Sequence, residues 1–223
     1  MYVAMMISPE KYYEEYLIGK SEKQILSSIC GLKNQIGHLK NVMEHPNYGT
    51  IPIIHSSEDV QIYCNRLYLQ RAIKALKDMG CSYKYSKTEL RIIELQNDLR
   101  YISNIALEIG GFFQSFSEYT IEIVEDYVTM SRTYCLSPER NETEKKIDKN
   151  ELLNQLSKLY IGEWRKYYTP ERFGYSVLDG TQWQLKLEFN NGRRLCKFGG
   201  SNSYPYNFNK LLDIFEIEGD VEI

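Results

Sequence analysis

Histidine is the side chain best suited to acid–base catalysis and metal binding near neutral pH. All three histidines, His38, His45 and His55, lie in the first quarter of the chain. The later part therefore has no imidazole for general-base or triad chemistry. None of the three has a ligand spacing such as H-x-x-x-H, so we expect loop histidines and not zinc ligands. The sequence predicts no catalytic residue, no metal site and no cofactor.

The common phosphate-binding and catalytic motifs are absent from the sequence. The chain contains no glycine-rich loop of the Walker or dinucleotide type, and no G-x-S-x-G or H-E-x-x-H motif. The run from Gly199 to Asn202 precedes the last predicted helix, where backbone N–H groups could hold an anion. We favour the alternative, in which Ser201 and Asn202 cap that helix and Pro205 begins it.

Basic side chains around the last predicted hairpin are the candidate binding residues. The segment 183–189 alternates apolar and polar residues, and Asn191-Gly192 suits a two-residue hairpin turn. This register places Leu187 opposite Cys196, Leu185 opposite Phe198, and Lys186 opposite Lys197. Like charges directly opposite each other favour an anionic partner. The candidate surface, basic and aromatic, comprises Lys186, Lys197, Arg193, Arg165 and Lys166.

The alternative for this surface is that its aromatic residues are core and its cations are simply solvated. Glu163, Glu171 and Glu188 are interleaved with the cations and dilute any field that would attract phosphate. We favour this alternative, and nucleic-acid binding is the second hypothesis.

Helical signals dominate the first part of the chain. Helix starts are predicted at Ser8-Pro9, at Ser21 with Gln24, at Ser56 with Asp59, and at Ser86 with Glu89. The second helix has a narrow apolar seam formed by Ile25, Ile29, Leu32, Ile36, Leu39 and Met43. The third has a broken stripe formed by Val60, Tyr63, Cys64, Leu67, Ala75, Leu76 and Met79. These two helices are predicted to form an antiparallel hairpin.

We expect the interaction surface on this helical hairpin rather than on the sheet, because Arg71 and Lys74 interrupt the stripe of the third helix and leave surplus apolar surface for a partner or oligomer contact. The competing expectation is that the helices dock on the rest of the chain through Tyr12, Tyr13 and Tyr16.

A change of period from about 3.6 to 2 after Asp98 predicts a β-rich second part. Strand faces are predicted at 101–109, 119–123 and 128–130, with a turn at Glu125-Asp126 and a solvated loop or linker at 138–146. Amphipathic helices follow at 148–159 and at 208–215. The predicted fold is α+β: a helical region at 1–97, then at 98–223 an antiparallel sheet built of ββα-type units with both helices on one face.

The composition of the chain bears on the cellular compartment in which the protein is expected. The hydrophobic share is 43% and the formal net charge is -3, which indicates a folded protein that is neither strongly basic nor strongly acidic. Five widely spaced cysteines predict neither a disulfide framework nor a zinc ribbon. Residues 1–7 are too short for a signal-peptide core, and no apolar run is long enough for a membrane span. We expect a cytoplasmic protein without membrane contact.

Four motifs of the chain are distinctive: Gly162-Glu163-Trp164-Arg165-Lys166-Tyr167-Tyr168, Asp179-Gly180-Thr181-Gln182-Trp183, Gly200-Ser201-Asn202-Ser203-Tyr204-Pro205 and, further forward, Met43-Glu44-His45-Pro46. Together they resemble a pattern found in uncharacterised bacterial proteins of the Clostridia type. The resemblance spans most of the chain but brings no assigned activity. It implies a bacterial, cytoplasmic protein, with carriage on mobile elements as one expectation.

These observations predict a non-enzymatic interaction protein, an adaptor or inhibitor acting through protein contacts, with an anti-defence role as one form. Its partner would be another protein or a second copy of the chain. The alternative is a nucleic-acid-associated protein that uses the basic surface of the last hairpin.

Overall fold

The computed structural model describes residues 6–49, 56–111, 114–125, 127–134, 137–143 and 148–217. The chain divides into two compact units, Met1–Tyr85 and Ser86–Ile223, and each is described by itself. The predicted α+β class is confirmed. The division falls before the helix that begins at Lys87 and not at Asp98, so this helix belongs to the sheet unit.

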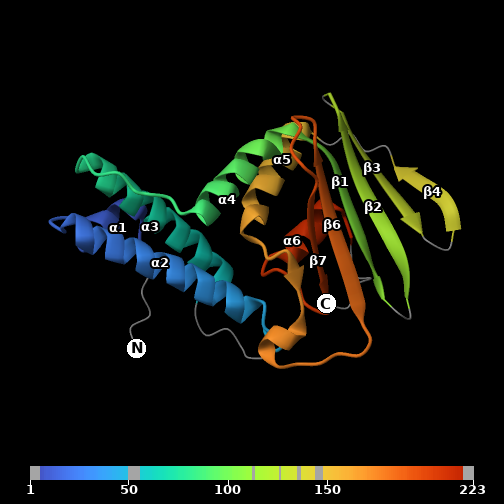
Figure 1. Ribbon diagram of the computed structural model, residues 1–223, viewed down its shortest axis with the longest axis horizontal. Coiled ribbons are helices and arrows are strands. Elements are labelled where there is room, and N and C mark those ends of the chain that lie inside the picture. Colours follow the sequence, from blue (N-terminus) through green and yellow to red (C-terminus); the bar gives the residue numbers. More distant parts are fainter. Residues whose placement is uncertain are drawn as a thin grey trace. The chain divides into compact units, whose positions relative to one another are not determined.

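The helical unit consists of α1 (Pro9–Tyr16), α2 (Glu22–Met43) and α3 (Glu58–Asp78), with α2 and α3 forming the predicted antiparallel hairpin (Figure 1). Ser8 caps α1, since its hydroxyl accepts a hydrogen bond from the Lys11 N–H at 3.1 Å. Ser21 and Gln24 form the predicted capping box of α2. The α2 seam is confirmed, because its buried residues are Ile25, Ile29, Leu32, Ile36 and Leu39.

The prediction for the buried side of α3 is wrong over its first half. The helix is capped at Ser57, not at Ser56, and Val60 and Tyr63 are exposed. The residues that α3 buries are Ile62, Asn65, Tyr68, Ala72, Ala75 and Leu76.

The packing of α1 explains the different face of α3. The ring of Tyr12 stacks on the ring of Tyr68 with centroids 4.4 Å apart, and the Arg71 guanidinium lies 3.5 Å from the centre of the Tyr13 ring. Arg71 is therefore part of the packing and not an interruption of it. Tyr12 and Tyr13, through which the competing expectation docks the helices on the rest of the chain, pack against the core of the helical unit.

The sheet unit begins with α4 (Lys87–Asp98) and a short 3₁₀ turn, η1 (Leu99–Tyr101). The remaining elements are β1 (Ile102–Gly111), β2 (Gln114–Val124), β3 (Tyr127–Tyr134), β4 (Ser137–Thr143), α5 (Lys149–Lys158), η2 (Ile161–Glu163), β5 (Tyr167–Tyr168), η3 (Pro170–Phe173), β6 (Thr181–Phe189), β7 (Cys196–Ser201) and α6 (Phe208–Ile214).

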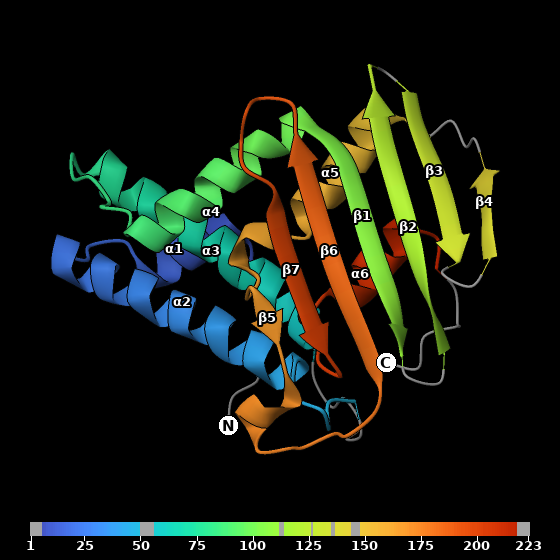
Figure 2. The same cartoon turned by 45° about the vertical axis from the view of Figure 1, so that its right-hand side comes forward.

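The strands form one seven-stranded sheet in the order β4-β3-β2-β1-β6-β7-β5. Neighbours are antiparallel except β5 and β7, which run parallel, so the predicted antiparallel sheet is confirmed apart from this short pair. Strand β1 lies between the β2–β3 and β6–β7 hairpins (Figure 2). Helices α4, α5 and α6 lie on one side of the sheet (Figure 1), which was predicted for α5 and α6 but not for α4.

The core fills the space between the sheet and these helices. Trp183, Leu185 and Leu187, the apolar residues of the predicted alternation, and Phe198 are all buried in it, and the predicted register of Leu185 with Phe198 is confirmed. The inward residues of β1 and β2 are Ile105, Leu107, Ile109, Tyr119, Ile121 and Ile123. The helices contribute Leu95, Leu152, Leu156, Leu159, Phe208, Leu211, Leu212 and Phe215.

The predicted loop at 138–146 is wrong over residues 138–143, which belong to β4. An edge strand needs only backbone hydrogen bonds to a neighbour, so the missing apolar pattern did not prevent pairing with β3. The predicted turn holds at Glu125, which has a φ of 54°. Asp126, Cys135, His55 and residues 144–147 lie outside the described residues.

The predicted two-residue turn between β6 and β7 is also wrong. Gly192 has a φ of 79°, but Asn191 does not have the positive φ that a type I′ turn needs. The Asn191 side chain accepts a hydrogen bond from the Arg193 N–H at 3.1 Å and donates one to Asp98 at 3.0 Å. Arg193 forms an ion pair with the same carboxylate. Asp98, at the end of α4, thus holds this longer connection.

The start of the last helix differs from the prediction as well. Helix α6 begins at Phe208, and Pro205 lies before it. The N-cap residue, Asn207, does not use its side chain to cap the helix. Its carbonyl accepts a hydrogen bond from the Trp164 indole N–H at 3.0 Å, and its amide donates one to the Leu159 carbonyl at 2.8 Å. Asn207 therefore joins α5, the segment at Trp164 and α6 inside the core.

The helices and the cysteines bear on the expectations about membrane spans and disulfides. Among the described residues, no helix combines the length and the apolar character that crossing a bilayer requires. The four described cysteines, Cys30, Cys64, Cys81 and Cys196, are free thiols.

The capping box of α4 gives a first prediction. The Ser86 hydroxyl accepts a hydrogen bond from the Glu89 N–H at 3.2 Å, and the Glu89 carboxylate accepts one from the Ser86 N–H at 2.8 Å. Replacing Ser86 with Ala removes one cap and is expected to lower the free energy of unfolding by about 1 kcal/mol in a denaturant melt. Ser82→Ala, at an exposed position outside any helix, is the control. Equal stability of the two variants would contradict the prediction.

Candidate functional site

The sheet has a second face, opposite α4, α5 and α6, which no helix of the sheet unit covers in Figure 2. We call it the open face. Side chains alternate along a strand, so each residue between two core residues points to this face. Its central residues are Gln182, Gln184, Lys186, Lys197, Ala106, Glu108, Glu118, Thr120 and Ser131.

Two pairs of like charges lie side by side on the open face. Lys186 is directly opposite Lys197, as predicted, and Glu108 is directly opposite Glu118. The Lys186 ammonium lies 3.7 Å from the Glu108 carboxylate, which joins the two pairs. In the described part of the chain, Lys197 and Glu118 form no ion pair. The outer member of each pair therefore keeps its charge available for a partner.

An aromatic residue borders the lysine pair. Tyr167 of β5 is 60% exposed, and its ring lies over Gly199 of β7, where a side chain would begin 3.6 Å from the ring carbons. Gly199 follows the core residue Phe198, so its missing side chain would point to the open face. The glycine thus leaves room for the tyrosine ring on the open face, two residues from Lys197.

The five predicted cations do not form one surface. Lys186 and Lys197 lie together on the open face. Lys166 instead places its ammonium 4.1 Å from the centre of the Phe198 ring, which belongs to the core side. Arg193 pairs with Asp98. Arg165 is exposed, and its backbone N–H donates a hydrogen bond to the Tyr168 hydroxyl at 2.9 Å.

The charge of the open face is therefore mixed and not basic. The prediction of opposed lysines is confirmed, but the anionic group that relieves them comes in part from Glu108 of the same sheet. The sequence could not show this pair, because the lysine and the glutamate are far apart in the chain and meet only through the pairing of β1 with β6.

The run from Gly199 to Asn202, considered as an anion cradle, has another role in the fold. Gly199 and Gly200 belong to β7, and the Gly199 N–H donates a hydrogen bond to the Lys166 carbonyl at 3.1 Å. A side chain at Gly200 would begin 2.7 Å from the Trp183 indole nitrogen, whose N–H donates a hydrogen bond to the Ser203 carbonyl at 3.0 Å. Gly200 is thus required by the packing of Trp183.

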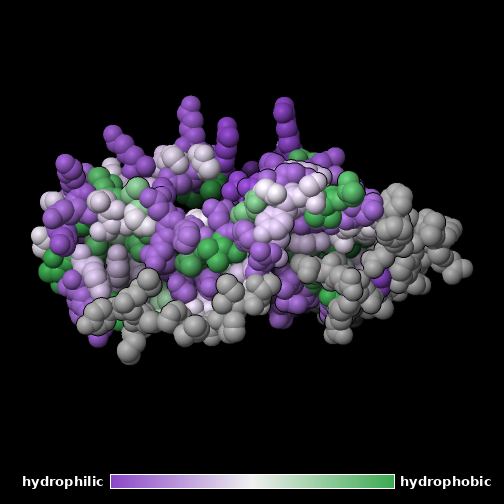
Figure 3. Space-filling model, turned by 90° about the horizontal axis from the view of Figure 1, so that it is seen from below, coloured by the Kyte–Doolittle hydropathy of each residue, from purple (hydrophilic) through white to green (hydrophobic). Residues whose placement is uncertain are grey.

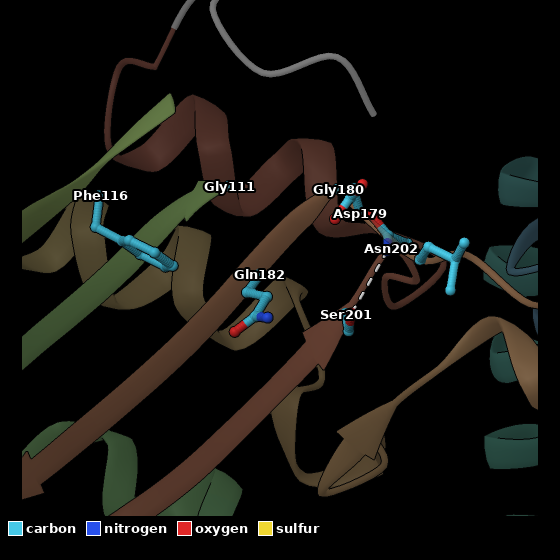
Figure 4. Close-up of a pocket in the computed structure, with 8 residues that line it drawn as sticks. Gly111, Phe116, Asp179, Gly180, Gln182, Ser201 and Asn202 are labelled. Atoms are coloured by element: carbon cyan, nitrogen blue, oxygen red, sulfur yellow. Dashed lines mark hydrogen bonds between the residues drawn. The ribbon is translucent and has the colours of Figure 1, made fainter. Parts of the chain in front are cut away.

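A small pocket lies at one end of the open face, where β1 and β7 end and β6 begins (Figure 4). We call it the end pocket. Its volume is about 180 Å³, and its lining residues are Gly111, Phe116, Leu178, Asp179, Gly180, Gln182, Ser201 and Asn202. Two of the sequence motifs, at 179–183 and 200–205, therefore meet at one site.

The sequence drew attention to both motifs but not to their meeting. The signal was the occurrence of glycine with short polar residues in each segment, which is typical of close backbone approach. The β6–β7 register then places Gln182 opposite Ser201. Sequence reasoning treated one motif as part of a strand and the other as a helix cap, so it missed the pocket.

Neither metal-ligating residues nor the surface of the helical unit provides a further candidate site among the described residues. In the ranges that the structure describes, no three His, Cys, Asp or Glu side chains gather as metal ligands would. Exposed apolar residues of the helical unit include Tyr16, Ile18, Tyr63 and Met79. On the face drawn in Figure 3, apolar residues occur in small groups separated by polar ones. Scattered exposed apolar residues are normal on protein surfaces and do not by themselves mark an interface.

Comparison of the chain with protein-family models, with curated proteins and with solved structures gives no match.

Proposed function

We propose that this protein is a non-enzymatic binding protein that contacts a protein partner through the open face of its sheet. The observation that carries the proposal is the pairing of Lys186 with Lys197 beside Glu108 with Glu118. Like charges placed directly opposite each other are unfavourable, and the Lys186–Glu108 ion pair relieves only the inner members. A partner that brings a carboxylate to Lys197 and a cation to Glu118 would relieve the outer members.

Mixed charge favours a protein over a nucleic acid. A phosphate backbone presents a single sign of charge, so glutamates beside the lysines repel it. A protein surface can present both signs in a fixed arrangement, and such complementarity gives specificity and orientation. The role of an adaptor or inhibitor in the cytoplasm, with anti-defence as one form, agrees with such a surface.

A second copy of the chain is one form of this partner. In such a dimer the open faces of two copies would face each other across a two-fold axis that runs parallel to the strands, above the boundary between β1 and β6. Strands β6 and β7 of one copy, which carry the lysines, would then lie over β1 and β2 of the other, which carry the glutamates. Self-complementary surfaces of this kind are the basis of two-fold symmetric dimers. Light scattering on the full chain distinguishes a second copy from a different protein as the partner. A dimer that dissociates when the charge of Lys197 is reversed identifies the second copy as the partner.

Nucleic-acid binding is the second candidate, and one observation favours it. The exposed Tyr167 ring lies over Gly199 two residues from Lys197, and Arg165 is exposed two residues before Tyr167. Stacking of bases on an aromatic ring beside cations is the usual basis of single-strand binding.

Charge reversal separates the two candidates. Lys197→Glu and Glu118→Lys are each expected to weaken capture of the partner from a native cell extract by about tenfold, because each variant repels a complementary protein surface. Lys23→Glu, at an exposed position on α2, is the matched control and should capture the partner as the unchanged chain does.

Nucleic acid would respond differently to the same variants. Lys197→Glu would weaken its binding, whereas Glu118→Lys would strengthen it. Opposite effects of the two variants, together with loss of the captured material after nuclease treatment, would replace the first candidate with the second. Unchanged capture by both variants would exclude the open face as the binding surface.

A further inference from the structure

The end pocket has polar walls held in place by the backbone. Asn202 has a φ of 48°, in the left-handed region, and its N–H donates a hydrogen bond to the Thr181 carbonyl at 2.9 Å. Gly180 has a φ of 151°, and a side chain there would begin 1.9 Å from the side-chain amide oxygen (Oδ1) of Asn202. Non-glycine residues with a left-handed backbone, such as Asn202, carry strain. Such strain persists where the surrounding structure fixes the backbone, and it is frequent at binding sites.

The lining of the pocket combines one charge with neutral acceptors. Asp179 is the one charged residue that lines it, and Gln182, Ser201 and Asn202 supply amide and hydroxyl oxygens. In the part of the chain that the structure describes, Asp179 has no ion pair or hydrogen bond through its carboxylate. Phe116 adds an aromatic side chain to the wall.

These groups select a positively charged donor. The Asp179 carboxylate accepts hydrogen bonds and attracts a cation, as the Phe116 ring does, whereas the amides and the hydroxyl can either accept or donate, so the carboxylate and the ring give the preference for a cation. We infer that the end pocket binds a cationic nitrogen group, an ammonium or a guanidinium. The volume of about 180 Å³ suits the end of a side chain, since pockets for drug-sized ligands occupy about 300–1,000 Å³.

Two sources could supply this group: a lysine or arginine side chain of the protein partner, and a free amine. The first source rests on the proposed function, because Gln182 and Ser201 belong to both the open face and the end pocket. A partner lying on the open face would then place a basic side chain at its end.

The test is a titration of the full chain with N-acetyl-L-arginine amide, followed by NMR of the backbone amides. Saturable shifts are expected at Gly111, Gly180 and Asn202. The neutral isostere N-acetyl-L-citrulline amide should bind at least about tenfold more weakly, since charge-assisted hydrogen bonds are roughly twice as strong as neutral ones. Putrescine, titrated in the same way, represents the free amine, and the tighter of the two cationic probes assigns the source.

Variants complete the test. Asp179→Asn should weaken binding of the arginine probe by about tenfold, whereas Asp213→Asn, at an exposed position on α6, should leave it unchanged. Both variants should melt like the unchanged chain, because Asp179 is exposed. Equal binding of the arginine and citrulline probes, equal binding by the Asp179 variant, or no saturable shift at the pocket would overturn the inference.

The result is separable from that of the proposed function. The titration needs no partner, and Lys197→Glu, which should disrupt partner capture, should leave binding of the arginine probe unchanged. Loss of partner capture in the Lys197 variant with no binding of the probe would retain the open face and overturn the end pocket.

Discussion

Replacing Leu187 with Ala is expected to lower the free energy of unfolding of the sheet unit by about 2–5 kcal/mol. Leu187 is 0% exposed and lies on β6, between Ile105 of β1 and Cys196 of β7. Removal of its side chain loses the transfer free energy of three carbon atoms and leaves a cavity where three strands meet. A denaturant melt followed by tryptophan fluorescence measures the effect, since both tryptophans belong to this unit.

Leu178→Ala is the matched control for this experiment. Leu178 is 98% exposed, so the same chemical change should alter the free energy of unfolding by less than about 0.5 kcal/mol. A change of less than about 0.5 kcal/mol in the Leu187 variant as well would mean that β6 presents its other face to the core. A shift of one residue in the register moves every side chain of a strand to the opposite face of the sheet.

Replacing Asn207 with Ala is expected to lower the free energy of unfolding of the same unit by about 2–6 kcal/mol. Asn207 is 4% exposed, and its side chain joins the Trp164 indole N–H to the Leu159 carbonyl. The variant leaves one buried donor and one buried acceptor without their partner, and each loss costs about 1–3 kcal/mol. Fluorescence of Trp164 should also change, because the hydrogen bond to its indole is lost.

Asn154→Ala is the matched control, since Asn154 is exposed on α5. It should be nearly neutral. If the two asparagine variants were equally stable, the hydrogen bonds of Asn207 would make no net contribution to the fold.

The elements that the sequence predicted correctly share a local signal. The α2 seam and the 183–189 alternation are each visible as a periodicity within one short segment of the sequence. Burial of one face of β6 then determines the register of Leu185 with Phe198. Capping boxes at Ser21 and Ser86 are equally local.

The wrong predictions share a different cause, which is a distant residue. Asp98 binds Asn191 and Arg193, so the connection between β6 and β7 does not form the tight turn that Asn-Gly favours. Asn207 binds Trp164 and Leu159, so it does not cap α6 with its side chain. In α3, packing of Tyr12 on Tyr68 overrides the expected stripe. Tertiary hydrogen bonds and stacking decided each case.

The candidate site was predictable only in part for the same reason. Opposed lysines followed from the hairpin register, but the glutamates beside them required the position of β1 between the two hairpins. The end pocket required both that position and the left-handed backbone at Asn202.

The short parallel strand β5 has a consequence for how other chains can approach the sheet. A long free edge offers unpaired N–H and C=O groups and invites strands of other molecules, which leads to aggregation. Beyond β7, this sheet offers only Tyr167 and Tyr168, and Pro170, which lacks an N–H, follows two residues later. Strand addition is therefore disfavoured where β5 covers β7, at Gly199 and Gly200. A partner that reaches this end of the sheet must bind to its side chains and not to its backbone.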